Sequence, residues 1–164
     1  MKRAQIDAFC GCRETLYQRI VFFAAPAILL AGIVYVTVRY AQLPAEIPSH
    51  YNFYGEIDGY GSRGTLWITP VIGILCDAVM LAVSFFPQTW NVGTSVTVFN
   101  RALVYRRVRD LIADMRLSTA VMFTAFAVWQ TALTPTFPWG MGVLIGVCCT
   151  APLVRFFVRL AMKK

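Results

Sequence analysis

Charged residues are scarce in this sequence. They make up 14% of its 164 residues, whereas ordinary soluble domains carry about 25%. Hydrophobic residues account for 58%, above the roughly 45–50% of soluble domains. A small soluble domain must keep a large surface hydrated, which a few clustered charges cannot do. We therefore exclude an ordinary soluble domain and predict an integral membrane protein.

Enzyme and nucleic-acid signatures are also missing. There is a single histidine, and the sequence has no Gly-x-Ser-x-Gly elbow, phosphate-binding loop or dinucleotide-binding fingerprint. The net charge of +7 comes from basic residues beside long apolar runs rather than from a basic stripe, so we exclude nucleic acid as a partner. We predict no catalytic residues and no cofactor, and the lipid bilayer is the expected partner.

The five cysteines are an odd number, and none lies in the loop that we place outside the cell. A disulfide framework is therefore not expected. Cys10 and Cys12 lack the second pair that a zinc site needs, and we interpret them as a reduced cytoplasmic pair, with metal binding or lipidation as the alternative. The others are expected to pack as small apolar residues: Cys76, Cys148 and Cys149.

Four apolar stretches have about the 17–25 residues that a helix needs to cross the hydrocarbon core. They run from residues 20–38, 66–86, 117–133 and 137–154. Thirteen of the fifteen Lys and Arg residues lie in the segments on one side of the membrane: the N-terminal tail, the second loop and the C-terminal tail. The positive-inside rule places these segments in the cytoplasm. Loop 39–65 and turn 134–138 then face outward.

These spans divide the chain into four segments. A cytoplasmic tail covers residues 1–19, and a two-span unit covers residues 20–86, with the outer loop at 39–65. A basic amphipathic cytoplasmic loop covers residues 87–116, and a two-span hairpin with a basic tail covers residues 117–164. The predicted fold class is an all-α integral membrane protein: a four-transmembrane-helix bundle with both termini cytoplasmic and an ordered extracytoplasmic loop between the first two helices.

The stretch 100–116 has an apolar helical face opposite a charged one. Val104, Val108, Leu111, Ile112 and Met115 form the apolar face. It either lies in the membrane interface or continues into the third span as one long helix. A lipid anchor and a docking surface for a cytoplasmic partner are both open.

Small residues recur at helical spacing in two spans. Gly73 and Ser84 share a face of the second span with Asp77, and Gly142 and Gly146 share a face of the fourth. Such spacing lets helix backbones approach closely. We expect packing inside the bundle, with homo-oligomerisation through Gly142 and Gly146 as the alternative.

Asp77 is the one acidic residue well inside a predicted span. A carboxylate at that depth is costly unless it is paired, hydrated or protonated. We name Thr124 and Gln130 as candidate hydrogen-bonding neighbours. A hydrogen-bond bridge between helices is the preferred interpretation, and proton or ion handling is the alternative.

The outer loop is dense in turn-forming, polar and aromatic residues. Two prolines start it as extended chain, and we expect Gly55, Gly59, Gly61 and Gly64 to supply positive-φ turns and Thr65 to cap the second span. The aromatic residues of the loop suit the headgroup layer. The candidate ligand-binding or loop-structuring residues are Pro44, Pro48, His50, Asn52, Gly55, Glu56, Asp58, Gly59, Gly61, Ser62 and Arg63.

His50, with Asn52, Glu56 and Asp58, allows three interpretations. His50 and Asp58 hydrogen-bond the backbone of the loop and hold its turns, the set recognises a ligand or peptide, or it forms an acid/base or divalent-metal site. The spacing matches neither the zinc-protease helix nor the calcium-binding loop. Whether a metal binds is therefore left open, and a structural role is preferred.

The loop resembles a known family through the pattern Leu43-Pro44-x-x-Ile47-Pro48-x-His50-x-Asn52-x-x-Gly55-Glu56-x-Asp58-Gly59-x-Gly61-Ser62. The pattern is similar to that of a bacterial domain of unknown function at the N-terminus of SdpI-type immunity proteins, which commonly has Lys where this chain has Arg63. The resemblance implies a multi-pass protein of the bacterial plasma membrane that protects its host from a secreted toxic peptide. The best-known members of this family also signal by holding a repressor at the membrane, so the resemblance implies such signalling as well.

Three functions follow as hypotheses. The first is a non-enzymatic recognition or immunity protein that binds an extracellular peptide or a membrane partner through residues 43–63, with a cytoplasmic regulatory protein as a further partner. The second is a small proton- or ion-coupled transport component that uses Asp77. The third is a membrane metalloenzyme that uses His50, Glu56 and Asp58.

Overall fold

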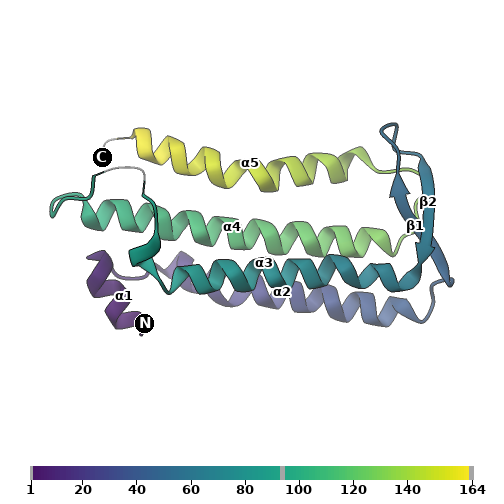
Figure 1. The fold of residues 1–164 in the computed structure, drawn as a ribbon, viewed down its shortest axis with the longest axis horizontal. Helices are drawn as coiled ribbons and strands as arrows, with labels where there is room; N and C mark the ends of the chain where they lie inside the picture. Colours follow the sequence, from purple (N-terminus) through teal and green to yellow (C-terminus); the bar gives the residue numbers. More distant parts are fainter. Residues whose placement is uncertain (1, 93–94, 163–164) are drawn as a thin grey trace.

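The computed structural model describes residues 2–92 and 95–162. Loop 87–116 therefore has two residues, and the basic C-terminal tail its final two lysines, outside the described part. The long helices lie side by side, and a β-hairpin crosses one end of the bundle (Figure 1). We call this the hairpin end. The short first helix and the last turn of the fifth lie at the opposite end, which we call the terminal end.

The structure has four helices long and apolar enough to cross a membrane among its described residues. Helix α2 spans Leu16–Tyr40, and η1 with α3 spans Arg63–Trp67 and Ile68–Ser84. Helix α4 spans Arg101–Gln130, and α5 spans Trp139–Ala161. The prediction of four spans is confirmed in this coarser sense. The short elements are α1 at Arg3–Cys10, β1 at Glu46–Tyr51, β2 at Ile57–Ser62 and η2 at Pro87–Thr89.

Helix α4 extends well beyond its predicted span. The amphipathic stretch 100–116 and the third span form one uninterrupted helix, as the second of the two interpretations held. The predicted apolar face is not the most buried one, because Met115 is exposed while Ala113, Asp114 and Arg116 are buried. The buried residues of this stretch therefore include charges, which only pairing with other helices can stabilise.

Helix α4 is the centre of the bundle and packs against α2, α3 and α5. Val21, Ala25 and Leu29 of α2 form the main core with Ala113 and Ala120 of α4. Close approach of α3 depends on Gly73, where an added Cβ would lie 2.9 Å from a Phe123 carbon. The expected packing role of Gly73 is confirmed.

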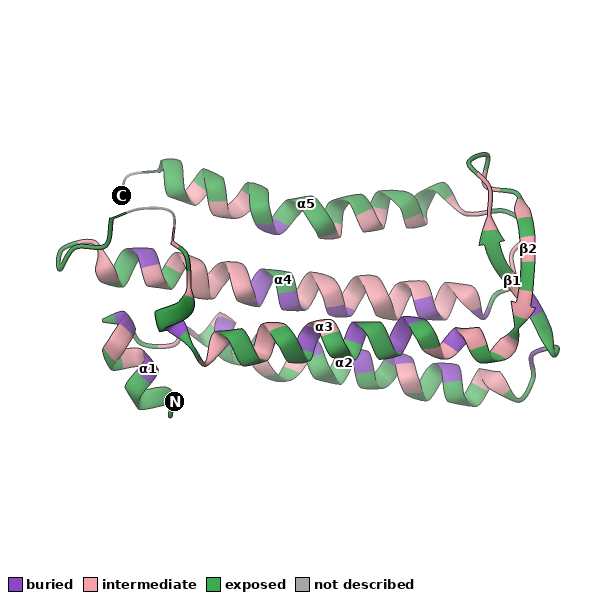
Figure 2. Ribbon diagram, in the orientation of Figure 1, coloured by how far each residue is buried: buried purple, intermediate pink, exposed green. Residues whose placement is uncertain are grey.

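Helix α5 is the outlying helix of the bundle. Only 6% of its most apolar window is buried, against 28% for each of the other three helices, and Figure 2 shows α5 mostly exposed, with some intermediate stretches. An added Cβ at Gly146 would meet nothing within 4 Å, and one at Gly142 only Phe137. The expectation that these glycines pack inside the bundle is wrong, because their face of α5 points away from the other helices.

The ordered outer loop is an antiparallel β-hairpin, so the protein is mostly helical rather than all-α. Ile47 pairs with Gly61 and Pro48 with Tyr60, with register irregularities on either side of His50. Leu43, Ile47 and Leu66 are almost fully buried and pack against Val36 and Ala127. The base of the hairpin is thereby fixed to α2 and α4.

The glycines of the hairpin have two different roles. Among the loop glycines only Gly55 has a positive φ, of 82°. Gly59 and Gly61 are needed for close strand approach instead, because an added Cβ would lie 3.1 Å from His50 Cβ and 3.2 Å from Ser49. The expectation of a positive-φ turn at Gly59, Gly61 and Gly64 is wrong.

The helix after the hairpin is capped by Ser62 rather than by Thr65. The Ser62 hydroxyl accepts a hydrogen bond from the Gly64 N–H, and the Thr65 hydroxyl donates back to the Ser62 carbonyl. The predicted cap is thus wrong by three residues, because a turn of 3₁₀-helix precedes α3.

At the terminal end, the predicted tail contains α1. Its Ile6 and Cys10 are buried and pack with Cys12, Phe85, Trp90 and Tyr105. Both cysteines are free thiols. Burial raises the pKa of the Cys10 thiol from its ordinary value of 9.0 to about 11.

Candidate functional site

The turn of the hairpin is organised by Asn52. Its side-chain oxygen accepts hydrogen bonds from the N–H groups of Tyr54 and Glu56, each at 2.9 Å. Its side-chain nitrogen donates to the Glu56 carboxylate at 3.0 Å. This is an Asx-type turn, in which a side chain replaces water as the partner of turn amides. Asn52 and Glu56 therefore fix the shape of the tip.

His50 and Asp58 pair with each other across the two strands. The imidazole Nδ1 lies 2.5 Å from the Asp58 carboxylate, and the His50 side chain is 72% exposed. Glu56 is engaged by Asn52, so the three proposed metal ligands are not brought together. Among residues 2–92 and 95–162, no group of three His, Cys, Asp or Glu side chains is arranged to bind a metal ion.

Arg63 fixes the base of the hairpin. Its guanidinium donates to the Leu43 carbonyl at 3.1 Å and lies over the Tyr40 ring at 4.8 Å. The backbone N–H of Arg63 donates to the Ala45 carbonyl at 2.9 Å. Pro44 lies just before β1, and Pro48 lies within it. The base and the turn are thus both held by side-chain contacts.

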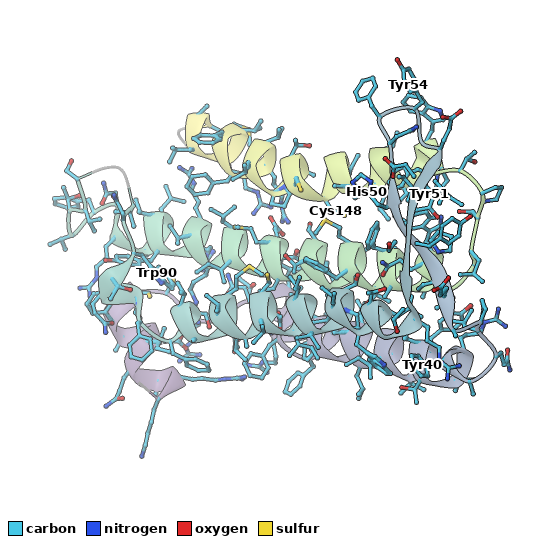
Figure 3. All side chains as sticks on the ribbon, turned by 45° about the vertical axis from the view of Figure 1, so that its right-hand side comes forward. Tyr40, His50, Tyr51, Tyr54, Trp90 and Cys148 are labelled. Carbon is cyan, nitrogen blue, oxygen red and sulfur yellow. The ribbon has the colours of Figure 1, made fainter. Side chains whose placement is uncertain are left out.

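The tip of the hairpin presents two aromatic side chains to the surroundings. Phe53 is 98% exposed and Tyr54 is 84% exposed, and their rings contact each other edge to face. Figure 3 shows Tyr54 at the free end of the hairpin and Tyr40 at its base. Three carboxylates and one guanidinium give residues 43–63 a formal charge of −2, in a chain of +7 overall. The site is therefore aromatic, acidic and rigidly held.

An open cavity of about 210 Å³ lies between β1 and the hairpin end of α4. It is lined by Pro48, Ser49, His50, Tyr51, Phe126, Trp129, Gln130 and Phe137. Only the β1 side of this cavity comes from the loop that sequence reasoning singled out. Trp129 and its aromatic neighbours were missed, because nothing local in the sequence tells which apolar residues of a span meet a distant loop.

The turn between α4 and α5 ties this cavity together. The Tyr51 hydroxyl donates to the Thr134 carbonyl, and the Trp129 indole N–H donates to the Thr134 hydroxyl, each at 3.0 Å. The Phe137 N–H donates to the Gly55 carbonyl at 2.7 Å. Burial raises the pKa of the Tyr51 phenol. The hairpin and the turn therefore form one connected structure at this end.

Asp77 lies at a second polar site, inside the bundle. Arg116 donates to its carboxylate from Nε at 2.7 Å and from a terminal nitrogen at 3.1 Å, and both side chains are at most 7% exposed. The expected neighbours are wrong: Gln130 accepts from Thr69, and Thr124 donates to a carbonyl of α2. Asp77 does connect two helices, through an ion pair.

Two further ion pairs join α4 to α5. Arg155 binds Asp114, and Arg159 binds Asp110 at 2.7 Å. Tyr17 of α2 also donates to Asp114, and Gln18 donates to Asp110. These contacts attach the outlying α5 to the bundle near the terminal end.

Sequence reasoning missed these pairs although a signal was present. Asp110 and Asp114 lie four residues apart, as do Arg155 and Arg159. Residues four apart share a helix face, so the two helices carry complementary charged faces. Arg116 was counted among the charges that flank the third span, so its buried position inside the bundle was not predicted.

The chain is similar to a domain family over part of its length and to an archaeal protein over most of it. Residues 27–74 match the model of a family described as a domain of unknown function, DUF1648. The match covers the second half of α2, the whole hairpin and the start of α3, and it ends before Asp77. An uncharacterized protein of Archaeoglobus fulgidus is 25% identical over 145 residues, covering 79% of each chain. No solved structure matches.

The class of protein follows from the fold. The chain is a mostly helical protein, and its described residues form four long apolar helices suited to a lipid bilayer. It is similar, over residues 27–74, to a domain family without an assigned function.

Proposed function

We propose that this chain is a non-enzymatic membrane protein that recognises a secreted cationic peptide through the hairpin at residues 43–63 and protects its host from that peptide. In this proposal the hairpin end faces outward and the terminal end faces the cytoplasm of a bacterial cell. Among the basic residues of loop 87–116, the exposed Arg106 then contacts anionic lipid on the inner side.

The proposal rests on the tip of the hairpin, where exposed aromatic side chains stand on a backbone turn that is fixed by hydrogen bonds. Phe53 and Tyr54 are 98% and 84% exposed, and Asn52 fixes the backbone beneath them. Aromatic side chains on a rigid support are typical recognition anchors, because binding orders little that is not already ordered. The family match, which includes the whole hairpin, supports this region as the functional one.

The charge of the hairpin supports a cationic partner. Glu46, Glu56 and Asp58 outnumber Arg63, so the hairpin attracts basic peptides and repels acidic ones. The buried ion pair of Asp77 with Arg116 supports an architectural role for Asp77, because a carboxylate that accepts two hydrogen bonds from a guanidinium is not a free proton carrier.

Tolerance to secreted peptides tests the proposal. Cells that express the chain, and cells that do not, are challenged with a panel of secreted cationic peptide toxins. We expect expression to raise tolerance to at least one of them. The variant Phe53→Ser/Tyr54→Ser should lose that tolerance while its level in the membrane stays unchanged.

The matched control is Val98→Ser/Phe99→Ser, which replaces two residues that are 91% and 100% exposed on the segment before α4. It should keep full tolerance. Tolerance to none of the peptides, or equal tolerance in the tip variant and the native chain, would overturn the proposal.

A further inference from the structure

The cavity beneath the hairpin is built mainly from aromatic rings. Trp129 is their centre: its ring centroid lies 5.0 Å from that of Phe137, 5.2 Å from Phe126 and 5.3 Å from Tyr51. All four residues line the cavity of about 210 Å³. Tyr51 comes from β1, and the other three come from the end of α4 and the turn that follows it, so the cluster exists only in the folded chain.

The polar atoms of these rings are already engaged. The Tyr51 hydroxyl and the Trp129 indole N–H both donate to Thr134. What the two residues offer to an occupant is therefore aromatic carbon. The faces of such rings carry partial negative charge and attract cations.

The charges around the cavity also bear on what it can bind. The lining includes neither Lys nor Arg, and His50, on the lining, is paired with the Asp58 carboxylate. Glu56 lies in the adjoining turn. The carboxylates of Asp58 and Glu56 thus belong to residues next to the lining, and their negative charge favours a cation over an anion.

The cavity is also preorganised. Phe137 is tied to Gly55 by a backbone hydrogen bond of 2.7 Å, and Glu56 forms a bridge with Thr136. A ligand that enters need not order the walls, which lowers the entropic cost of binding.

We propose that this cavity binds the ammonium or guanidinium group of a basic side chain, Lys or Arg, through cation–π contact with Trp129 and Phe126. The inference rests on the proposed function and specifies its chemistry: the tip contacts the peptide, and the cavity takes one basic side chain of it. A protonated amine of a lipid headgroup has the same chemistry, and the experiment separates the two sources.

The test uses purified full-length protein labelled with 5-fluorotryptophan, in nanodiscs of phosphatidylglycerol. The chain has four tryptophans, and Trp129→Phe assigns the Trp129 fluorine signal. The probes are Nα-acetyl-lysine methylamide and its uncharged counterpart, Nα-acetyl-norleucine methylamide. We expect the lysine probe to shift the Trp129 signal saturably and the norleucine probe to leave it unchanged.

Two variants locate the binding energy. Phe126→Leu removes one ring but keeps an apolar side chain, and it should weaken the lysine probe about three- to tenfold. Asp58→Asn should weaken it by a smaller factor. The matched control Phe99→Leu alters a fully exposed ring outside the cavity and should leave affinity unchanged.

Each other outcome overturns the inference. No shift with either probe removes the site, and an equal shift with norleucine makes it an apolar cavity without cation preference. Binding that disappears when phosphatidylethanolamine is added to the nanodiscs makes a lipid headgroup the occupant.

If the tip variant loses tolerance while the lysine probe fails to bind, the cavity inference fails and the proposed function stands. If the lysine probe binds while the tip variant keeps full tolerance, the cavity binds a cation and the proposed function fails.

Discussion

The guanidinium of Arg116 on α4 donates two hydrogen bonds to the carboxylate of Asp77 on α3, in a place where neither side chain is more than 7% exposed. Asp77 lies seven residues from the end of α3, or about 10 Å along the helix. Such a pair neutralises two charges that would each be costly in lipid. It also fixes α3 against α4 in both rotation and depth.

Replacing only one member of this pair should be far more damaging than replacing both. Asp77→Leu and Arg116→Leu each leave a buried charge unpaired, and we expect each to lose about 3–5 kcal/mol of unfolding free energy. The double variant removes both charges and should recover most of that loss. Unfolding in mixed micelles with increasing dodecyl sulfate measures all three. A loss of unfolding free energy in the double variant equal to the sum of the two single losses would contradict the pairing.

Two glycines in the spans should respond differently to the same substitution. Gly73→Ala places a carbon 2.9 Å from Phe123 and 3.0 Å from Leu29, so we expect a loss of about 1–3 kcal/mol from overpacking. Gly146→Ala meets no atom within 4 Å and should leave stability unchanged or raise it by up to about 1 kcal/mol, because alanine favours a helix more than glycine does. The same micelle unfolding compares them. A large loss at Gly146 would show that this face of α5 is covered in the folded protein.

Hydropathy predicted the four spans because it depends on local composition. The hairpin shows where local patterns stop. The ordered state of the loop was predicted from its prolines and glycines, but its strands were not. Gly59 and Gly61 are typical turn residues, and only the folded structure shows that they let the strand of Ser49 and His50 approach.

The sites divide in the same way. His50 and Asp58 lie eight residues apart and could be grouped from the sequence. Arg116 and Asp77 are separated by 39 residues, and only the packing of α3 on α4 brings them together. The aromatic cavity likewise depends on the tertiary contact between β1 and the end of α4.

The buried thiol of Cys10 should be slow to react near neutral pH. Burial raises its pKa to about 11, and the thiolate is the reactive form. We expect iodoacetamide to label Cys10 much more slowly in the folded protein than in the chain unfolded in dodecyl sulfate, with mass spectrometry identifying the labelled residue. Equal rates would contradict the burial of Cys10.

The same shift makes stability depend on pH. The folded chain binds the Cys10 proton more tightly than the unfolded chain, so this contribution is complete below pH 9 and is lost as the pH rises through about 11. The variant Cys10→Ala should lack this part of the alkaline decline. An identical decline in both proteins would contradict the assignment.

The most direct test of the account is photo-crosslinking between the hairpin and the peptide to which the chain confers tolerance. A benzophenone amino acid replaces Tyr54 or, as the control, the fully exposed Phe99, and cells are irradiated with the labelled peptide. The account predicts a peptide adduct at position 54 that excess unlabelled peptide suppresses, and none at position 99. No adduct at position 54, or equal yields at the two positions, would contradict recognition by the hairpin.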